Sequence, residues 1–124
     1  MKIFLKTEDE IQLMRSANQL VGRTLAELYK FVRPGITTLQ LDRIAEEFIR
    51  DNGAVPTFKN FPNPFGKSFP ASICTSVNNV VVHGIPDNLT VLRDGDVISI
   101  DCGTLFAGFN GDSCYTFRVG EVKP

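Results

Sequence analysis

The sequence is poor in histidine and cysteine, which leaves little room for a catalytic site built from several copies of either residue. It contains one histidine, His83, and three cysteines among 124 residues, so a site made from several imidazoles is excluded for this chain. The three thiols cannot all pair within one chain, and no Cys-x-x-Cys spacing indicates zinc or redox chemistry. We therefore expect a reducing, cytoplasmic location, and any chemistry must depend on carboxylates.

The sequence also lacks an excess of charge of one sign and long apolar runs. Thirteen basic residues against 14 acidic ones leave no basic stripe that could neutralise several phosphates, so we expect no nucleic-acid partner. No stretch reaches the roughly 18 apolar residues that cross a bilayer, and the charged start lacks the apolar segment of a signal peptide. No membrane partner is therefore expected. The length suits one hydrophobic core, which predicts a single domain over residues 1–124.

Residues 7–53 have the pattern of two helices that pack against a sheet. In each, apolar residues recur at intervals of three and four, which places them on one face. Each helix begins with a capping box and ends at a turn signal. The capping boxes are Thr7 with Glu10 and Thr37 with Gln40, and the stop signals are Arg33-Pro34-Gly35 and Asp51-Asn52-Gly53. The apolar faces are Ile11, Met14, Ala17, Val21, Leu25, Leu28 and Val32 in the first helix and Leu41, Ile44, Ala45, Phe48 and Ile49 in the second.

Residues 54–70 combine prolines with large aromatic rings. Because proline removes backbone donors and fixes torsion angles, this segment is predicted to be a loop, neither strand nor helix. Two interpretations of the rings stay open: they plug the edge of the core, or they line an apolar pocket for a ligand. The residues concerned are Pro56, Pro62, Pro64 and Pro70 with Phe58, Phe61, Phe65 and Phe69.

From residue 71 onward the pattern predicts short strands joined by brief turns. Turns this short leave no room for crossover helices, so the sheet should be antiparallel. Two helices on one face of such a sheet give the α+β class. The predicted strands are Ala71–Val77, Val80–His83, Val97–Cys102, Leu105–Phe109 and Ser113–Val119, and the turn signals include Asn78-Asn79, Arg93-Asp94-Gly95-Asp96 and Asn110-Gly111.

Two aspartates carry the main chemical signal. If a tight turn lies near Phe106-Ala107-Gly108, the two strands of this hairpin place Asp101 directly opposite Asp112, with β-carbons roughly 4.5 to 5.5 Å apart. Two ionised carboxylates at that distance repel each other. Three arrangements relieve the repulsion: a bound divalent cation, a proton shared by the two groups, or a slipped register that sends one aspartate to solvent.

Four segments resemble the type I methionine aminopeptidases, in that family's order and spacing. The similarity runs through essentially the whole chain. The His-Gly-Ile-Pro turn, together with two aspartates eleven positions apart, makes it specific. The segments are residues 34–42 (PGITTLQLD), 76–86 (SVNNVVVHGIP), 94–101 (DGDVISID) and 108–112 (GFNGD).

The resemblance implies a metal-dependent hydrolase with half of the pita-bread fold, which removes the initiator methionine from nascent peptides. Asp101 would bind one divalent cation and Asp112 would bridge two, the metals being manganese, iron, cobalt or zinc. The implied partner is a peptide or nascent chain that begins with Met. Asn78 and Val80 match positions whose backbone carbonyls bind a monovalent cation in relatives.

The resemblance also assigns substrate contacts. His83 matches a histidine that contacts the substrate near the scissile peptide without binding metal, where it could hydrogen-bond or assist proton movement. Cys74 and Phe69 match positions in the apolar pocket for the methionine side chain, which suits a thioether through sulfur and ring contacts. Without the surrounding motifs, the favoured interpretation of His83 is an ordinary polar residue that closes a strand before Gly84.

Members of the resembled family complete the metal site with a histidine and two glutamates from a second half, and this chain ends before any of them. We therefore expect an amino-terminal half that is inactive alone, binds metal weakly and self-associates through surface that the second half covers. Two alternatives stay open: half of a creatinase or prolidase-type metallopeptidase, and a non-catalytic binding module on the same fold.

Overall fold

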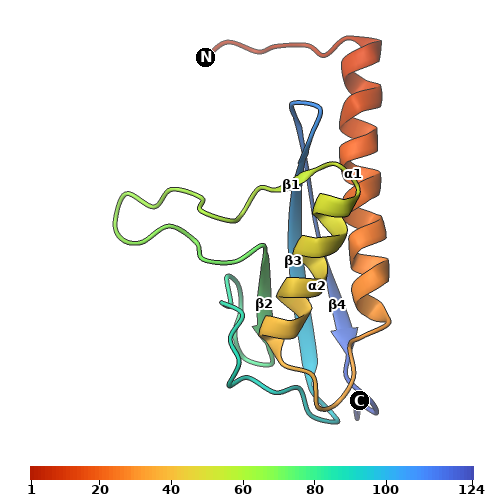
Figure 1. Cartoon of the computed structure of the whole chain (residues 1–124), viewed down its shortest axis with the longest axis vertical. Coiled ribbons are helices and arrows are strands. Elements are labelled where there is room, and N and C mark those ends of the chain that lie inside the picture. Colours follow the sequence, from red (N-terminus) through yellow and green to blue (C-terminus); the bar gives the residue numbers. More distant parts are fainter.

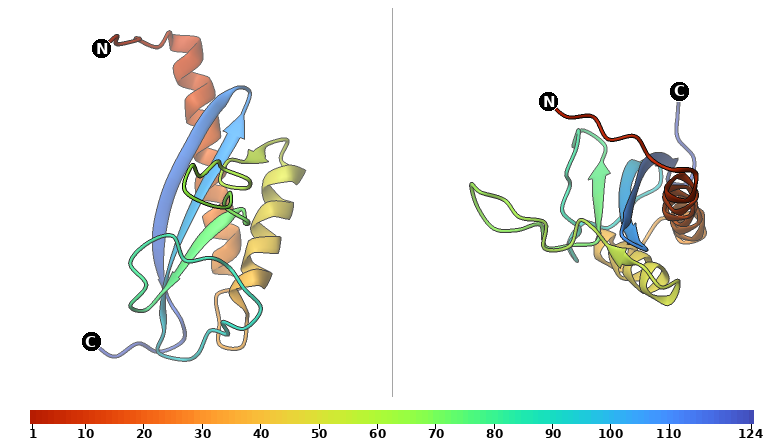
Figure 2. Two further views of the ribbon diagram at one scale, coloured as in Figure 1. Left: turned by 90° about the vertical axis from the view of Figure 1, so that its left-hand side faces the viewer. Right: turned by 90° about the horizontal axis from the view of Figure 1, so that it is seen from above.

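The computed structural model describes all 124 residues as two helices on one side of an antiparallel sheet (Figures 1 and 2). The elements are α1 (Glu8–Tyr29), α2 (Thr38–Asp51), β1 (Val55–Pro56), β2 (Ile73–Val77), β3 (Val97–Phe106) and β4 (Phe109–Arg118). This arrangement confirms the predicted α+β class. The opposite side of the sheet carries no helix, and neither helix is both long enough and apolar enough to cross a membrane.

Both helices begin where their capping boxes predicted. The Thr7 hydroxyl accepts the Glu10 N–H at 3.2 Å and the Glu10 carboxylate accepts the Thr7 N–H at 2.9 Å, and Thr37 and Gln40 repeat this exchange. The predicted end of the first helix was wrong, because α1 stops at Tyr29. The chain then turns toward α2. In this connection, the Gly35 N–H donates to the Leu92 carbonyl, and the Ile36 carbonyl accepts the Leu92 N–H.

Strand β3 is the centre of the sheet. β4 pairs along its whole length, while β2 and β1 share its other edge, end to end. The short strand β1 was missed by the sequence analysis, which assigned residues 54–70 entirely to a loop. Pro56 is tolerated there because this strand lies at the edge of the sheet, where proline need not donate to a ladder.

The hairpin between β3 and β4 turns at Ala107 and Gly108, one residue later than predicted. Both residues have positive φ, 51° and 83°, as the two central positions of a tight hairpin turn require. Two further predictions were wrong: Leu105–Phe109 is not a separate strand, and Asn110-Gly111 is not a turn. Gly111 lies within β4, where the Ala17 carbonyl of α1 comes so close that a Cβ would lie 2.6 Å from it.

The predicted strand Val80–His83 does not exist. These residues form an exposed loop, although their valines have high strand propensity. The loop returns to β2 at Gly84, where the Thr75 N–H donates to the Gly84 carbonyl at 2.8 Å. Propensity failed here because no neighbouring strand accepts the hydrogen bonds of residues 80–83.

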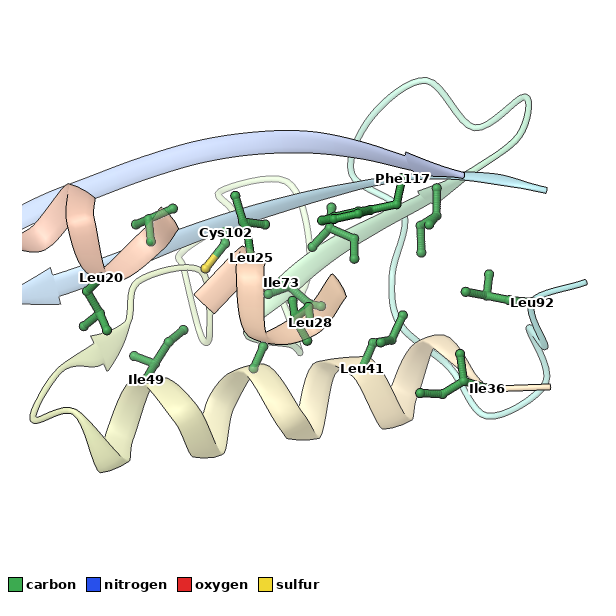
Figure 3. Close-up of a cluster of buried hydrophobic side chains, with 14 of the residues drawn as sticks. Leu20, Leu25, Leu28, Ile36, Leu41, Ile49, Ile73, Leu92, Cys102 and Phe117 are labelled. Carbon is green, nitrogen blue, oxygen red and sulfur yellow. The ribbon is translucent and has the colours of Figure 1, made fainter. Parts of the chain in front are cut away.

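The core lies between the helices and the sheet (Figure 3). Alternate residues of β3 point into it, and the apolar faces of α1 and α2 cover them, as the helical spacing predicted. Thr104 is also buried on this side, where its hydroxyl donates to the Ala17 carbonyl at 2.9 Å. The buried residues of the cluster include Leu20, Val21, Leu25, Leu28, Ile36, Leu41, Ala45, Ile49, Ile73, Leu92, Ile98, Ile100, Cys102 and Phe117.

The segment after β1 leaves the body of the molecule as a loop that is closed at its base (Figure 1). The Asn60 N–H donates to the Phe69 carbonyl at 2.8 Å, and the Phe69 N–H donates to the Phe61 carbonyl at 3.1 Å. The tip contains a small turn, in which Asn63 accepts hydrogen bonds from Phe65 and Gly66. The predicted loop over residues 54–70 is therefore confirmed from residue 57 onward and wrong at the short strand β1.

The close approach of α1 to Gly111 gives a stability prediction. Gly111→Ala should destabilise the fold by about 1–3 kcal/mol, since the new methyl group overlaps the Ala17 carbonyl and the packed helix cannot move freely. Gly22→Ala in α1 is the matched control, because nothing lies within 4 Å of its Cβ position. That change should stabilise by about 0.5–1 kcal/mol. Urea unfolding of both variants is the measurement, and equal effects would contradict the proposed contact.

Candidate metal and peptide site

The side of the sheet without helices carries the predicted acidic residues, and we call it the open face. Alternation along β3 sends Ser99, Asp101 and Gly103 to this face, because their neighbours Ile98, Ile100, Cys102 and Thr104 are buried beneath the helices. In the strand register, Asp101 lies between Cys74 of β2 and Cys114 of β4. A row of side chains from three strands therefore crosses the open face at Asp101.

The predicted register between the two aspartates was wrong by two residues. Asp101 faces Cys114, and Asp112 faces Gly103. Because side chains alternate with a period of two, this shift leaves both aspartates on the open face as diagonal neighbours, and neither turns to the other side. The register differs because the turn is centred between Ala107 and Gly108, where two consecutive residues adopt positive φ.

Asp101 is a half-buried carboxyl with an unsatisfied oxygen. Its Oδ1 atom is buried and has no hydrogen-bond partner. Burial raises the pKa of Asp101 to about 6, and the neighbouring carboxylate of Asp112 adds to the rise. The positive charge of His83 acts in the opposite direction. An orphaned carboxylate oxygen beside a second carboxylate is a position that a cation would stabilise.

The thiols that flank Asp101 are held in the protonated form. Burial raises the pKa of Cys74 to about 11, and the charges of Asp101 and Asp112 contribute to the rise. The pKa of Cys114 is raised by the same causes. Neither thiol has the lowered pKa of a nucleophile. Cys74 is therefore a buried, neutral sulfur on the open face, and its role in a pocket stays a prediction.

His83 is held at the edge of the open face by the residue that follows it. The Gly84 N–H donates to the Ser76 hydroxyl at 3.2 Å, and the Gly84 carbonyl accepts the Thr75 N–H. A Cβ at Gly84 would overlap the Thr75 carbonyl, so only glycine allows this approach. His83 itself has φ of 59° and an exposed side chain. The loop thus presents the imidazole near Asp101, whose pKa responds to its charge.

Asp42 of α2 is a supporting residue whose role the sequence analysis missed. Its Oδ1 accepts the N–H groups of Ser72 at 2.7 Å and Ile73 at 3.0 Å, which fixes the start of β2 immediately before Cys74. Asp42 is buried, and burial raises its pKa. The signal in the sequence was the position of Asp42 beside Leu41, on the face of α2 that otherwise carries apolar residues. A charged side chain on such a face is rarely buried without a partner.

The aromatic rings after β1 were predicted either to plug the edge of the core or to line an apolar pocket, and they differ in how far they are buried. Phe58 covers Gly103, where a Cβ would lie 2.7 Å from the ring, so one ring lies on the open face beside Asp112. Phe69 is half-buried, whereas Phe61 and Phe65 are exposed, the latter by 96%. The sequence analysis did not predict the contact between Phe58 and Gly103. The only sequence feature that reflects this contact is the glycine itself, which follows Asp101-Cys102.

Two other predicted positions lie at the far end of β2. The Asn78 side chain accepts the Val97 N–H at 3.1 Å and donates to Asp96 at 3.0 Å, so it ties together the two ends of the long connection between β2 and β3. Val80 lies in the following loop, where its N–H donates to the Val77 carbonyl at 3.1 Å. The monovalent cation at these backbone carbonyls remains a prediction.

The donor set for a divalent cation is incomplete in this chain. No group of three or more His, Cys, Asp or Glu side chains is placed to hold a metal. Asp101 and Asp112 supply carboxylate oxygens, of which one is orphaned and buried, so they suit a hard or borderline cation. Tight binding needs about four to six donors, so these two carboxylates alone do not make a tight site.

A comparison with known protein families identifies the class of protein. The sequence profile of metallopeptidase family M24 matches residues 12–124, and the chain belongs to this family. Membership implies the use of divalent metal. The predicted resemblance is confirmed at this level, whereas the roles of single site residues stay predictions.

Individual relatives are similar along nearly the whole chain. Methionine aminopeptidase from Clostridium perfringens is 54% identical over 121 residues, which cover 98% of this chain and 46% of that protein. Methionine aminopeptidase 1 from Bacillus subtilis is 48% identical with the same coverage. The crystal structure of methionine aminopeptidase from Rickettsia prowazekii superposes with a TM-score of 0.91 at 37% identity, covering 98% of this chain and 47% of that one. The chain thus spans about half the length of these relatives.

More distant structures share the fold alone. Xaa-Pro dipeptidase from Bacillus anthracis superposes with a TM-score of 0.76 at 22% identity and covers 96% of this chain. The predicted alternative of a prolidase-type half therefore has support from architecture only.

The raised pKa of Asp101 predicts how stability depends on pH in the absence of metal. Because the folded pKa lies near 6 and the ordinary value is 3.8, folding disfavours the ionised carboxyl and stability falls as pH rises through this range. Asp101→Asn should remove the penalty and be more stable than wild type at pH 7 by about 1 kcal/mol, allowing for solvent screening.

The measurement is urea unfolding of wild type and Asp101→Asn at several pH values between 4 and 7. Asp87→Asn is a control of opposite sign, because hydrogen bonds from Thr90 lower the pKa of Asp87 and its ionised form stabilises the fold. That variant should be less stable than wild type by a nearly constant amount over this range, because Asp87 titrates below its ordinary pKa of 3.8. A difference between wild type and Asp101→Asn that is constant over this pH range would contradict the prediction.

Proposed function

We propose that the open face is part of the active site of a metal-dependent aminopeptidase that removes methionine from the amino terminus of peptides. The observation that carries this proposal is the buried, unpartnered Oδ1 of Asp101 beside Asp112, in a chain of the M24 family. Relatives named methionine aminopeptidase, at 48–54% identity, support this specificity over that of the Xaa-Pro enzymes.

Asp101 and Asp112 are the residues of this chain that would hold the metal. Divalent cations, when bound, lower the pKa of a water and stabilise charge on the attacking and leaving atoms. Asp101 contributes an oxygen that has no other partner, and its half-buried position limits competition from bulk water. We propose manganese, iron, cobalt or zinc as the metal, since oxygen-dominated ligation suits each of them.

The neighbouring residues of the open face are suited to bind the peptide. His83 projects from its loop with a free imidazole, which can donate a hydrogen bond to the peptide near the scissile bond or move a proton there. Cys74 supplies a neutral sulfur, and Phe58 and Phe69 supply rings, so a methionine thioether would meet an apolar wall. The three free thiols support the proposal of a reducing, cytoplasmic setting.

Transplantation into a relative is the direct test. The 121 residues of the Clostridium perfringens enzyme that match this chain are replaced by the chain itself. The hybrid should release methionine from a Met-Ala-Ser peptide, and Asp101→Asn or Asp112→Asn should lower kcat/KM by at least about a hundredfold, because each removes charge that holds the metal. An Xaa-Pro peptide is the substrate control. Cleavage of that peptide in preference to Met-Ala-Ser would contradict the proposal.

His83→Ala in the same hybrid separates its role from metal binding. The variant should lower kcat by about a hundredfold while the metal content of the protein stays unchanged, since the imidazole is proposed to act on the peptide. Inductively coupled plasma mass spectrometry of the purified variant gives the metal content. Loss of metal in His83→Ala would make the imidazole a ligand and contradict the assignment.

The 124-residue chain alone should bind metal weakly. Two carboxylates predict a dissociation constant for Mn²⁺ above about 0.1 mM, measured by calorimetry, and no detectable release of methionine. Asp101→Asn should abolish the binding heat, whereas Asp51→Asn at the end of α2 should leave it unchanged. Micromolar affinity in the chain alone would show ligands that the two aspartates do not account for.

A further inference from the structure

Two carboxylates of α2, one helical turn apart, reach toward the closed loop of residues 57–70. Asp42 and Glu46 are four positions apart, so they lie on the same face of the helix. Asp42 holds the chain where the loop ends, through the N–H groups of Ser72 and Ile73. Glu46 holds the chain where the loop begins, since its two carboxylate oxygens accept hydrogen bonds from the Lys59 ammonium at 2.8 and 3.0 Å. The helix therefore contacts both legs of the loop.

The contact between Lys59 and Glu46 is the only polar side-chain link between this loop and the rest of the molecule. The only other hydrogen bond from residues 57–70 to the body runs from the Thr57 N–H to the Gly103 carbonyl, at 3.2 Å. The Lys59 and Glu46 side chains are partly shielded from water, with exposed fractions of 35% and 22%. The hydrogen bond from Lys59 lowers the pKa of Glu46 although burial opposes the shift, so this carboxylate stays ionised at neutral pH.

Phe58, the residue before Lys59, reaches the other side of the sheet. Its ring lies over Gly103 on the open face, where a Cβ would be 2.7 Å from the ring. Gly103 faces Asp112 in the strand register. The ring and the ammonium are thus carried by adjacent residues, which are joined by one planar peptide unit. Fixing the ammonium on α2 therefore restricts where the ring can lie on the open face.

We propose that Lys59 and Glu46 are a positioning pair, whose contact holds the Phe58 ring in place on the open face. The consequence for substrate binding rests on the proposed function, in which this ring is part of an apolar wall for the substrate side chain. The consequence for the position of the ring does not. Arg50 also donates to Glu46, at 3.2 Å, so loss of Lys59 leaves the carboxylate paired on the helix. The pair therefore acts on the loop and not on the fold of α2.

The position of the ring can be measured in the 124-residue chain without metal or peptide. The chain has no tryptophan, so Phe58→Trp introduces a single fluorophore at the place of the ring. Adding Lys59→Met should shift the emission to longer wavelength, because the released ring becomes exposed to water. Lys67→Met is the matched control, since it makes the same change at the exposed tip of the same loop and should leave the emission unchanged. Equal spectra of the Lys59→Met and Lys67→Met variants would overturn the proposal.

Kinetics of the hybrid with the Clostridium perfringens enzyme test the consequence for substrate binding. Lys59→Met should raise KM for Met-Ala-Ser about fivefold while kcat stays within about twofold, on the scale of a partly exposed ion pair. Glu46→Gln should have the same effect. The double variant should raise KM no further than either change alone, because both changes break one contact. Lys59→Arg keeps the charge and should retain the KM of the unmodified hybrid.

The possible results separate this inference from the proposed function. A hybrid that releases no methionine would contradict the proposed function, and the emission of Phe58→Trp would still decide where the ring lies. In an active hybrid, a purely structural role for Lys59 would lower the stability of Lys59→Met in urea unfolding without a change in KM. That result, or effects of Lys59→Met and Glu46→Gln on KM that simply add, would overturn the positioning role.

Discussion

The backbone of β3 is the constraint from which the core and the candidate site both derive. It pairs with all three other strands, so its register fixes their positions. Its alternation sends Ile98, Ile100 and Cys102 beneath the helices and leaves Asp101 on the open face. Burial of the first set holds the strand in register, because a slip of one residue would place a carboxyl in the core. The acidic site is therefore fixed by apolar packing on the reverse side of the same strand.

The packing of α1 on the hairpin links the two sides more closely. The Ala17 carbonyl accepts a hydrogen bond from Thr104 of β3 and lies against Gly111 of β4, while Asn18 accepts the N–H of Asp112. One turn of the helix thus contacts both strands that carry the aspartates. Asp42 does the same for β2 from the second helix. The two helices consequently position the open face without contributing a side chain to it.

Local sequence patterns predicted most of the fold. The features that they did not predict depend on contacts between residues far apart in the sequence. The capping boxes at Thr7 and Thr37 and the apolar stripes give both helices, since these signals lie within one or two turns of chain. The turn of the hairpin was predicted wrongly because Asn110-Gly111 is a strong turn signal. In the structure, glycine is needed at position 111 because the Ala17 carbonyl, far away in sequence, lies against it. Asp101 and Asp112 were still placed together, because an error of two residues preserves the face. Phe58 and Asp42 could not be assigned, as their partners are known only once strands and helices are assembled.

The closed base of the loop between Asn60 and Phe69 has a consequence for how such proteins diversify. Two backbone hydrogen bonds tie the ends of the loop together before the chain enters β2. The entropy of closing a loop grows slowly with its length, so added residues near Asn63 cost little and transmit no displacement to the strand. Evolution can therefore lengthen or shorten this tip, and with it the rim of the open face, while the register of the strands is inherited unchanged.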